Sequence, residues 1–312
     1  MSDVLSPKVV RDVLTERELK PSKALGQNFV CDKNTVDKII FLADIDSTSS
    51  VLEIGPGLGA LTVPLVKKGF KVLAVEKDLK LAERLDGESL PGLKVLAMDA
   101  MKLDWGQLLA TPWPELIGAP FTGKSEFFTV QSGSEKIDPL ANDALVRGGM
   151  NWHLVANLPY NIATHLIISI LEQAESVTEM LVMVQKEVGL RLCADPGSKV
   201  YGISTLKLSY FARSKIVGKI SREVFFPKPN VDSVLVQIRR RTAEEIAADF
   251  AGYDVISYLA GKAFSQRRKM LRHSLRNVLQ EADYGQAMLS STLRPEQLDI
   301  NDWSRLAKCY KY

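Results

Sequence analysis

The chain has 312 residues, of which 46% are hydrophobic and 25% charged, and its formal net charge is +3. This length allows one large core, or a main domain with a smaller one. No apolar run reaches the roughly 18 residues that a membrane-spanning helix needs, and the charged N-terminal stretch does not resemble a secretory signal. The three cysteines and three histidines are scattered, so we expect no disulfide framework, no zinc site and a reducing, cytoplasm-like compartment.

Short apolar strands alternate with helical segments through the first two thirds of the chain. Each strand is a continuous apolar run, which is typical of strands buried on both faces. Asp78 is a good N-cap for the helix that follows the second strand. The pattern predicts an α/β fold with a mostly parallel sheet covered on both faces, with strands at 50–54, 71–75, 94–98, 153–157 and 180–184 and helices at 60–69 and 78–85.

Residues 104–151 interrupt this alternation between the third and fourth strands. The segment contains several prolines and glycines, and its apolar residues show little periodicity, so we interpret it as a long insertion. Loops of this length are normally functional or mobile. The insertion begins just past Asp99 and ends just before the fourth strand, so we expect it to lie beside the mouth of the site at the strand ends.

After residue 198 the pattern changes. A predicted helix at 202–212 is followed by two strands, and the sequence is helical from residue 244 onward. The strands are at 215–220 and 233–241. We therefore expect a first domain over 1–244 and a small helical domain over 245–312.

Basic residues are concentrated in two segments of the last third of the chain. Residues 213–241 and 260–276 each carry a net charge of +6, and because the whole chain carries +3, the remainder carries −9. A predicted helix at 266–279 repeats arginine every four residues beside an apolar stripe, at Arg268, Arg272 and Arg276. The asymmetry predicts contact with a polyanion such as nucleic acid; the alternative is a solvated helix face.

The stretch EIGPGLG, residues 53–59, follows the first strand and opens the first helix. Gly55, Gly57 and Gly59 let the backbone turn sharply and approach a ligand closely. A dinucleotide site is one interpretation, but the G-x-G-x-G spacing and the preceding acid, Glu53, do not suit a pyrophosphate. The carboxylate suits a ligand with a positive amino-acid end, such as the sulfonium compound S-adenosylmethionine.

The next three strands also end in polar side chains. Glu76 ends the second strand, 21 residues after Gly55, where an acid can bind both hydroxyls of a ribose. Asp99 follows the third strand, where a carboxylate can accept from an adenine amino group. Asn157 ends the fourth. Because ligands of open α/β sheets bind at the carboxyl ends of the strands, we expect these residues to share one site with the glycine turn.

The turn after the fourth strand is NLPY, residues 157–160. An exocyclic base nitrogen is a poor nucleophile because its lone pair is conjugated into the ring. The side-chain oxygen of Asn157 and the carbonyl of Leu158 can accept both amino hydrogens and favour a tetrahedral nitrogen. Pro159 stiffens the turn, and Tyr160 can stack on a flipped-out base. The alternative is an ordinary turn in which Asn and Pro break the strand.

Five motifs, in this order, resemble those of the ribosomal small-subunit RNA adenine dimethyltransferases: LGQNFVCD (25–32), LEIGPGLGALT (52–62), NLPYNIAT (157–164), FFPKPNVDS (225–233) and AFSQRRKMLR (263–272). The resemblance extends from about residue 22 to 310, apart from 104–151. It implies a Rossmann-like S-adenosylmethionine-dependent methyltransferase domain with a small all-helical C-terminal domain. The implied activity is N6,N6-dimethylation of two adjacent adenines near the 3′ end of small-subunit ribosomal RNA, a step of small-subunit biogenesis.

The resemblance also assigns roles to individual residues. It implies that the cofactor contacts Asn28, Val30, Gly55, Gly57, Glu76, Asp99 and Asn157. It implies that Tyr160 and Phe226 enclose the target base, with Phe225 as the competing second ring. It implies that the RNA backbone meets Arg267, Arg268, Lys269 and Arg272. Local chemistry alone does not point to Asn28 or Val30.

Three other interpretations stay open. They are a resistance-type methyltransferase of large-subunit RNA, a non-catalytic nucleic-acid-binding assembly or transcription factor on the same fold, and an NAD-dependent oxidoreductase. The amino-acid sequences of the motifs at 225–233 and 263–272 favour the small-subunit group. We expect the partner to be small-subunit RNA, the ribosomal subunit or its precursor, and we expect no membrane, no metal and a cytoplasmic monomer.

Overall fold

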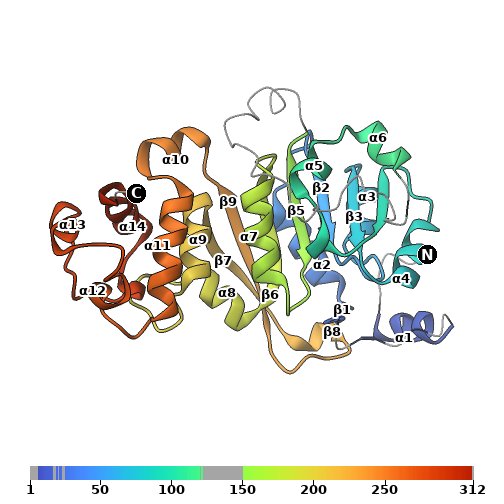
Figure 1. Ribbon diagram of the computed structural model, residues 1–312. Coiled ribbons are helices and arrows are strands. Elements are labelled where there is room, and N and C mark those ends of the chain that lie inside the picture. The colour runs from blue at the N-terminus through green and yellow to red at the C-terminus, as the bar shows by residue number, and fades with distance from the viewer. Residues whose placement is uncertain are drawn as a thin grey trace. The chain divides into compact units, whose positions relative to one another are not determined.

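A seven-stranded sheet forms the centre of the protein (Figure 1). The structure, a computed structural model, describes residues 6–16, 19, 21–22, 25–119, 121 and 150–310. The strand order is β4-β3-β2-β5-β6-β9-β7, and β1 and β8 form a separate two-stranded sheet. The strands are β1 (Phe29–Val30), β2 (Ser50–Ile54), β3 (Val72–Glu76), β4 (Leu93–Ala97), β5 (Trp152–Asn157), β6 (Val177–Gln185), β7 (Ala212–Ile220), β8 (Phe225–Phe226) and β9 (Ser233–Arg240).

The five strands predicted in the first two thirds of the chain are confirmed. From β4 to β6 each strand pairs in parallel with its neighbour. Every residue of β2 and β3 is buried, as strands covered on both faces require. Helices α2 (Lys33–Ala43) and α3 (Thr62–Lys67) pack on one face with Val51, Val155 and Leu181. Helices α5 (Trp105–Ala110) and α7 (Ala163–Gln173) cover the opposite face (Figure 1).

The remaining helices follow the predicted pattern in most places. Asp78 caps α4 as expected, since its carboxylate accepts from the N–H groups of Lys80 and Leu81. The other helices are α1 (Pro7–Glu16), α4 (Leu79–Asp86), α6 (Trp113–Gly118), α8 (Lys186–Leu192), α9 (Ile203–Phe211), α10 (Ala243–Asp249), α11 (Tyr253–Ser265), α12 (Leu271–Ser274), α13 (Glu281–Gln286) and α14 (Ile300–Cys309). Among the described residues, none of these helices is long and apolar enough to cross a membrane.

The prediction that 104–151 has little regular structure is wrong for its first part. The Asp104 carboxylate accepts from the N–H of Gln107 and starts α5, and α6 follows. Trp105 and Leu108 are fully buried, and their three-residue spacing places both on one helical face. Residue 120 and residues 122–149 of the predicted insertion lie outside the described residues.

The chain forms two compact units. The first comprises residues 1–186 and 216–238, and the second comprises 187–215 and 239–312. The division differs from the expected one at residue 244, because α9 belongs to the helical unit. Tyr201, Leu206 and Tyr210 are buried with α11 and α14 in one core cluster there.

The predicted continuous helix at 266–279 is wrong. Helix α11 ends at Ser265, residues 266–268 form a turn, and only 271–274 are helical again. The N–H groups of Leu271 and Arg272 donate to the carbonyls of Leu293 and Ser291 instead of to residues four positions earlier. The three arginines therefore do not line one continuous helix.

Leu108→Ala tests whether α5 is part of the core. We expect the free energy of unfolding to fall by about 2–5 kcal/mol, because a fully buried leucine loses its packing. Urea denaturation measures this change. Gln107→Ala, on the exposed side of the same helix, is the matched control and should change stability little; equal losses in the two variants would mean that α5 does not pack as described.

Candidate functional site

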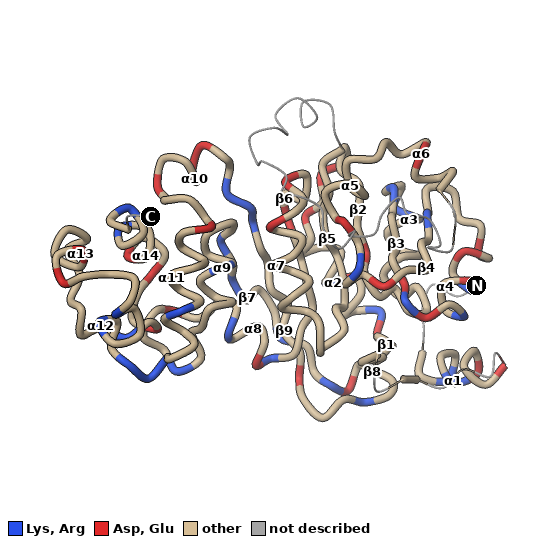
Figure 2. Tube along the Cα trace, viewed as in Figure 1, with Lys and Arg blue, Asp and Glu red and all other residues tan. Residues whose placement is uncertain are grey.

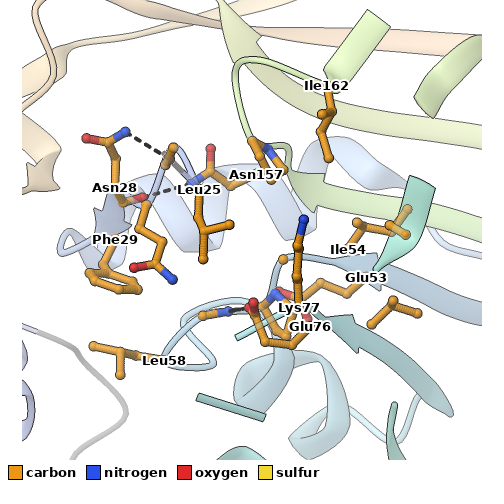
Figure 3. A pocket seen from close by; sticks show the side chains of 18 of the residues that line it. Leu25, Asn28, Phe29, Glu53, Ile54, Leu58, Glu76, Lys77, Asn157 and Ile162 are labelled. Carbon is orange, nitrogen blue, oxygen red and sulfur yellow. Dashed lines mark hydrogen bonds between the residues drawn. The ribbon is translucent and has the colours of Figure 1, made fainter. Parts of the chain in front are cut away.

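A pocket opens where the carboxyl ends of β4, β3, β2 and β5 lie side by side (Figure 3). Its empty space is about 1070 Å³, part of which is open solvent. The order in which the chain adds strands to the sheet reverses at β2. The strands β3 and β4 lie on one side of β2, and the later strands β5 and β6 lie on the other. Open α/β sheets bind ligands at such switch points. The predicted residues that line the pocket are Asn28, Val30, Gly55, Gly57, Glu76, Asp99, Asn157 and Pro159.

The glycine turn after β2 forms the floor of the pocket. Gly55 and Gly57 have φ of +69° and +56°, a region that side chains with a Cβ rarely adopt. A Cβ at Gly57 would lie 2.9 Å from Cε1 of Phe29, and a Cβ at Gly55 would lie 3.5 Å from the Pro159 ring. The turn therefore uses glycine both for its conformation and for its close approach to the neighbouring walls.

Glu76 fixes the glycine turn. Its Oε2 accepts from the N–H of Gly57 at 3.0 Å and its Oε1 from the N–H of Asp78 at 2.9 Å. The side chain is buried. Burial raises the pKa of Glu76, and the hydrogen bonds from Asp78 and Gly57 offset only part of that rise. The carboxylate expected to bind a ribose is therefore also the group that positions the turn.

Glu53 lies beneath the same turn. Its Oε2 accepts from the hydroxyl of Thr62 at 2.6 Å, and the side chain is 2% exposed. Burial raises the pKa of Glu53 to about 8; the Thr62 hydrogen bond lowers it, and the nearby Glu76 raises it further. Glu53 and Glu76 thus favour a ligand that brings positive charge, because a cation nearby stabilises their ionised forms.

Asp99 is shared between two partners at the edge of the pocket. Its Oδ2 forms an ion pair with Nζ of Lys77 at 2.9 Å, and its Oδ1 accepts from the N–H of Met101 at 3.0 Å. Partial burial raises the pKa of Asp99, but the bonds from Lys77 and Met101 outweigh it and the net shift is downward. An adenine amino group bound here would share the carboxylate with Lys77.

Asn157 is held in one orientation. Its Nδ2 donates to the backbone carbonyl of Asn28 at 3.0 Å. Its Oδ1 is buried and has no hydrogen-bond partner in the described part of the chain. A flipped amide would place two acceptors against each other, so the Asn28 carbonyl fixes the orientation in which the amide oxygen is the unpartnered atom. Buried unpartnered acceptors are uncommon and often mark functional sites.

The rest of the NLPY turn is anchored to its surroundings. The N–H of Leu158 donates to the carbonyl of Met183 on β6 at 3.1 Å. The carbonyl of Pro159 accepts from the N–H groups of Ile162 and Ala163, both at 3.2 Å. The turn that follows β5 is therefore fixed on both sides of Pro159.

The two rings expected to enclose a base, Tyr160 and Phe226, are not among the pocket's lining residues. The Tyr160 hydroxyl lies 3.0 Å from the Ser233 hydroxyl. Phe226 is half-buried, opposes Phe29 in the two-stranded sheet and has the Arg11 guanidinium 5.4 Å from its ring centre. Phe225 is only 4% exposed and belongs to the core. Phe226 is therefore the more accessible of the two candidate rings.

The family model described as ribosomal RNA adenine dimethylase matches residues 19–311. A ribosomal RNA small subunit methyltransferase A from Bifidobacterium longum (strain DJO10A) is 36% identical over 96% of this chain and 91% of its own. One from Leifsonia xyli subsp. xyli is 37% identical over 97% of this chain and 98% of its own.

The chain belongs to the ribosomal RNA adenine dimethylase family. Membership confirms the predicted enzyme class, a methyltransferase of ribosomal RNA adenines, and its predicted methyl donor, S-adenosylmethionine. The acids and glycine turn described above fit this donor, because it carries positive charge and no phosphate.

Two solved structures of the same fold confirm the predicted Rossmann-like α/β class. A dimethyladenosine transferase from Plasmodium falciparum has a TM-score of 0.62 at 23% identity, over 89% of this chain and 95% of its own. The 23S rRNA methyltransferase ErmE has a TM-score of 0.61 at 22% identity, over 90% of this chain and 99% of its own. The fold alone therefore does not separate enzymes of the two ribosomal subunits.

The family's expected RNA-binding residues lie in the second unit, where basic residues follow the chain between α11 and α12 (Figure 2). Arg268, Lys269 and Arg272 are exposed. Arg267 is different, since its Nη2 donates to the Lys199 carbonyl at 2.8 Å and its Nε lies 3.9 Å from Glu296. Arg267 is therefore tied into its own unit.

Sequence reasoning missed several pocket residues. The sequence gives no sign that Lys77 lines the pocket, because a lysine that follows a strand usually points into solvent. Leu25 and Ile162 also line the pocket. Leu25 lies in the motif at 25–32 and Ile162 in the motif at 157–164. Their positions in these two motifs are the signal by which the sequence could have indicated them.

Gly57→Ala tests the glycine turn. A residue with a Cβ at positive φ costs about 1–3 kcal/mol, and the added methyl would meet Phe29, so we expect S-adenosylmethionine to bind about tenfold or more weakly. Calorimetric titration measures this. Gly261→Ala in α11, where a Cβ meets no atom within 4 Å, should leave the affinity unchanged; equal affinities for both variants would contradict the described turn.

Proposed function

We propose that the protein dimethylates the N6 amines of two adjacent adenines near the 3′ end of small-subunit ribosomal RNA, with S-adenosylmethionine as donor, and so contributes to small-subunit biogenesis. The observation that carries this proposal is the unpartnered Oδ1 of Asn157, held in the pocket wall by the bond from Nδ2 to Asn28. A substrate amine supplies the donor that this oxygen lacks.

The proposed mechanism is alignment and charge stabilisation by the NLPY turn. S-adenosylmethionine would supply the methyl group, whose bond to the positive sulfur breaks as the bond to the amine nitrogen forms, leaving neutral S-adenosylhomocysteine. Asn157 Oδ1 and the Leu158 carbonyl accept the two hydrogens of the adenine amine, which directs the nitrogen lone pair away from the ring system. As the nitrogen becomes positive, the same two oxygens stabilise it. The proton then leaves to solvent, and no strong base is needed.

Cofactor recognition follows from the other three strand ends. We assign the ribose hydroxyls to Glu76 and the adenine amine to Asp99, while Gly55 and Gly57 provide close backbone approach. Asn28 and Val30 line the same pocket. Tyr160 and Phe226 are assigned to the target base, which must leave the RNA stack to reach the amide.

The small-subunit assignment is supported by the relatives named small subunit methyltransferase A, at 36–37% identity over nearly the whole chain. A large-subunit enzyme is the second candidate, because ErmE shares the fold equally well. Mass spectrometry of both ribosomal RNAs, from cells with and without the protein, separates them. Loss of dimethyladenosine from the small-subunit RNA alone supports the proposal, and loss from the large-subunit RNA contradicts it.

We also propose that the enzyme acts in the cytoplasm on the small ribosomal subunit or its precursor. The three cysteines are free and half-buried, which fits a reducing compartment. The expected monomeric state and the absence of a metal stay predictions; light scattering and metal analysis of the purified protein test them.

Asn157→Ala tests the catalytic amide. We expect methyl transfer to fall about a hundredfold or more, because the acceptor of the amine is lost. RNA affinity should stay within about threefold, since phosphate contacts supply most of it. Rates with radiolabelled donor and filter binding measure the two effects. An active Asn157→Ala variant would remove the amide from the mechanism.

Arg268→Ala combined with Arg272→Ala tests the RNA-contacting segment. We expect weaker RNA binding and a salt dependence reduced by about two phosphate contacts, measured by titrations at several salt concentrations. Arg305→Ala is the control, because that side chain is bound to Asp302 within its own unit. An unchanged slope in the double variant would show that these arginines do not meet the RNA backbone.

A further inference from the structure

A hydroxyl pair connects the NLPY turn to the start of β9. Oη of Tyr160 and Oγ of Ser233 are 3.0 Å apart, and Ser233 is 0% exposed. Tyr160 itself is half-buried. Burial raises the pKa of Tyr160 more than the Ser233 bond lowers it, so the phenol stays neutral and keeps its hydrogen bond at neutral pH.

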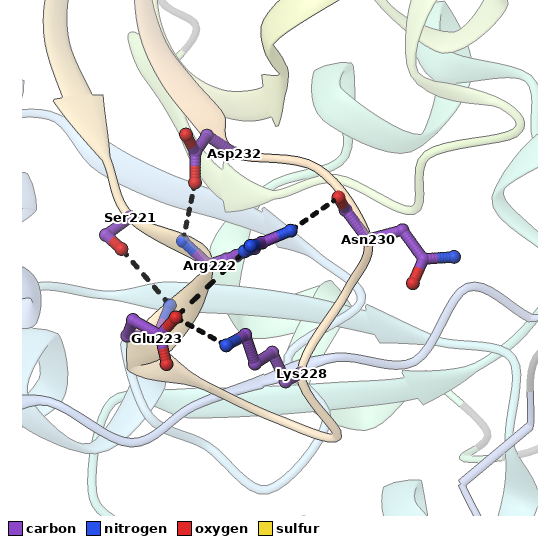
Figure 4. Close-up of polar contacts among 6 residues, drawn as sticks. All are labelled: Ser221, Arg222, Glu223, Lys228, Asn230 and Asp232. Carbon is purple, nitrogen blue, oxygen red and sulfur yellow. Dashed lines mark hydrogen bonds and ion pairs between the residues drawn. The ribbon is translucent and has the colours of Figure 1, made fainter.

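Ser233 is held in place by the loop that precedes it, residues 221–232 (Figure 4). The N–H of Arg222 donates to Oδ1 of Asp232 at 3.0 Å, and Nη1 of Arg222 donates to the Asn230 carbonyl at 3.1 Å. The Asp232 carbonyl accepts from the N–H of Lys186 at 3.0 Å. These bonds close the loop on itself and fasten its end to the segment that follows β6.

The same loop carries the second ring. Phe226 lies in β8 and is fixed by pairing with Phe29 of β1. An ion pair between Lys228 and Glu223 joins the two sides of this loop (Figure 4). One closed loop therefore holds Phe226 directly and holds Tyr160 through the Ser233 hydroxyl.

We propose that Ser233 is a positioning residue for methyl transfer: its hydroxyl holds the Tyr160 ring at a fixed place relative to Phe226, ready for the target adenine. The inference rests on the proposed role of the two rings around the base. Without the bond, the Tyr160 ring can turn away about its side-chain torsions, and fewer enzyme–RNA complexes hold the base in the reactive position.

The test uses Ser233→Ala, Tyr160→Phe and the double variant. Single-turnover methyl transfer to small-subunit RNA is measured at saturating S-adenosylmethionine. Each single change removes one side of the same hydrogen bond, so we expect each to slow transfer by about threefold to tenfold. We expect the double variant to be no slower than either single variant, because the bond is already lost. Donor affinity should not change.

A merely structural role gives a different result. If Ser233 only supports local packing, the two losses multiply in the double variant, and the inference is wrong. A Tyr160→Phe variant with the full rate also overturns it, even if Ser233→Ala does not fold. Ser50→Ala is the matched control, because Ser50 is also a buried serine, 2% exposed, at the start of a strand, β2; the rate of this variant should be unchanged.

The failure of this inference is distinguishable from that of the proposed function. A wild-type protein that transfers no methyl group to ribosomal RNA refutes both. An active wild-type protein with multiplying losses refutes the role of Ser233 alone and leaves the catalytic amide intact.

Discussion

One hydrogen bond, from Nδ2 of Asn157 to the carbonyl of Asn28, determines what the site can do. It joins residues 129 positions apart, so it exists only when the N-terminal motif is folded against the end of β5. An amide offers a donor on one side and an acceptor on the other, and a fixed carbonyl decides which side remains available. In the proposed mechanism, the reacting amine meets an oxygen that is oriented before substrate binds, which is the condition for efficient charge stabilisation.

The opposite side of the pocket is organised by charge and backbone shape together. Glu76 holds the glycine turn through the Gly57 N–H, while buried Glu53 lies beneath it. Burial raises the pKa of both carboxyl groups. A positively charged ligand nearby would stabilise their ionised forms. The two acids therefore suit a positively charged sulfonium donor better than a pyrophosphate-containing cofactor, and the family assignment implies such a donor.

The sequence predicted the parts of the fold that depend on local pattern. The five parallel strands and the Asp78 cap follow from apolar runs and capping chemistry, and the strand-end acids were placed correctly around one pocket. The failures concern contacts distant in sequence. The helix predicted at 266–279 breaks because Leu271 and Arg272 donate to residues 293 and 291. The hydrogen bonds by which Glu76 holds the glycine turn, and the ion pair of Lys77 with Asp99, likewise depend on neighbours that folding brings together. The failure to predict helix α5 has another cause, because the three-residue spacing of Trp105 and Leu108 is a local helical pattern that the sequence itself contains.

In the proposed mechanism, the Asn157 oxygen accepts from the target amine while the side-chain nitrogen still donates to the Asn28 carbonyl. A crystal structure with adenosine and S-adenosylhomocysteine tests it most directly. We expect adenosine N6 to lie about 3 Å from Asn157 Oδ1, with the hydrogen bond to Asn28 intact. An adenosine whose amine lies elsewhere in the pocket, or an Asn157 side chain released from Asn28, would contradict it.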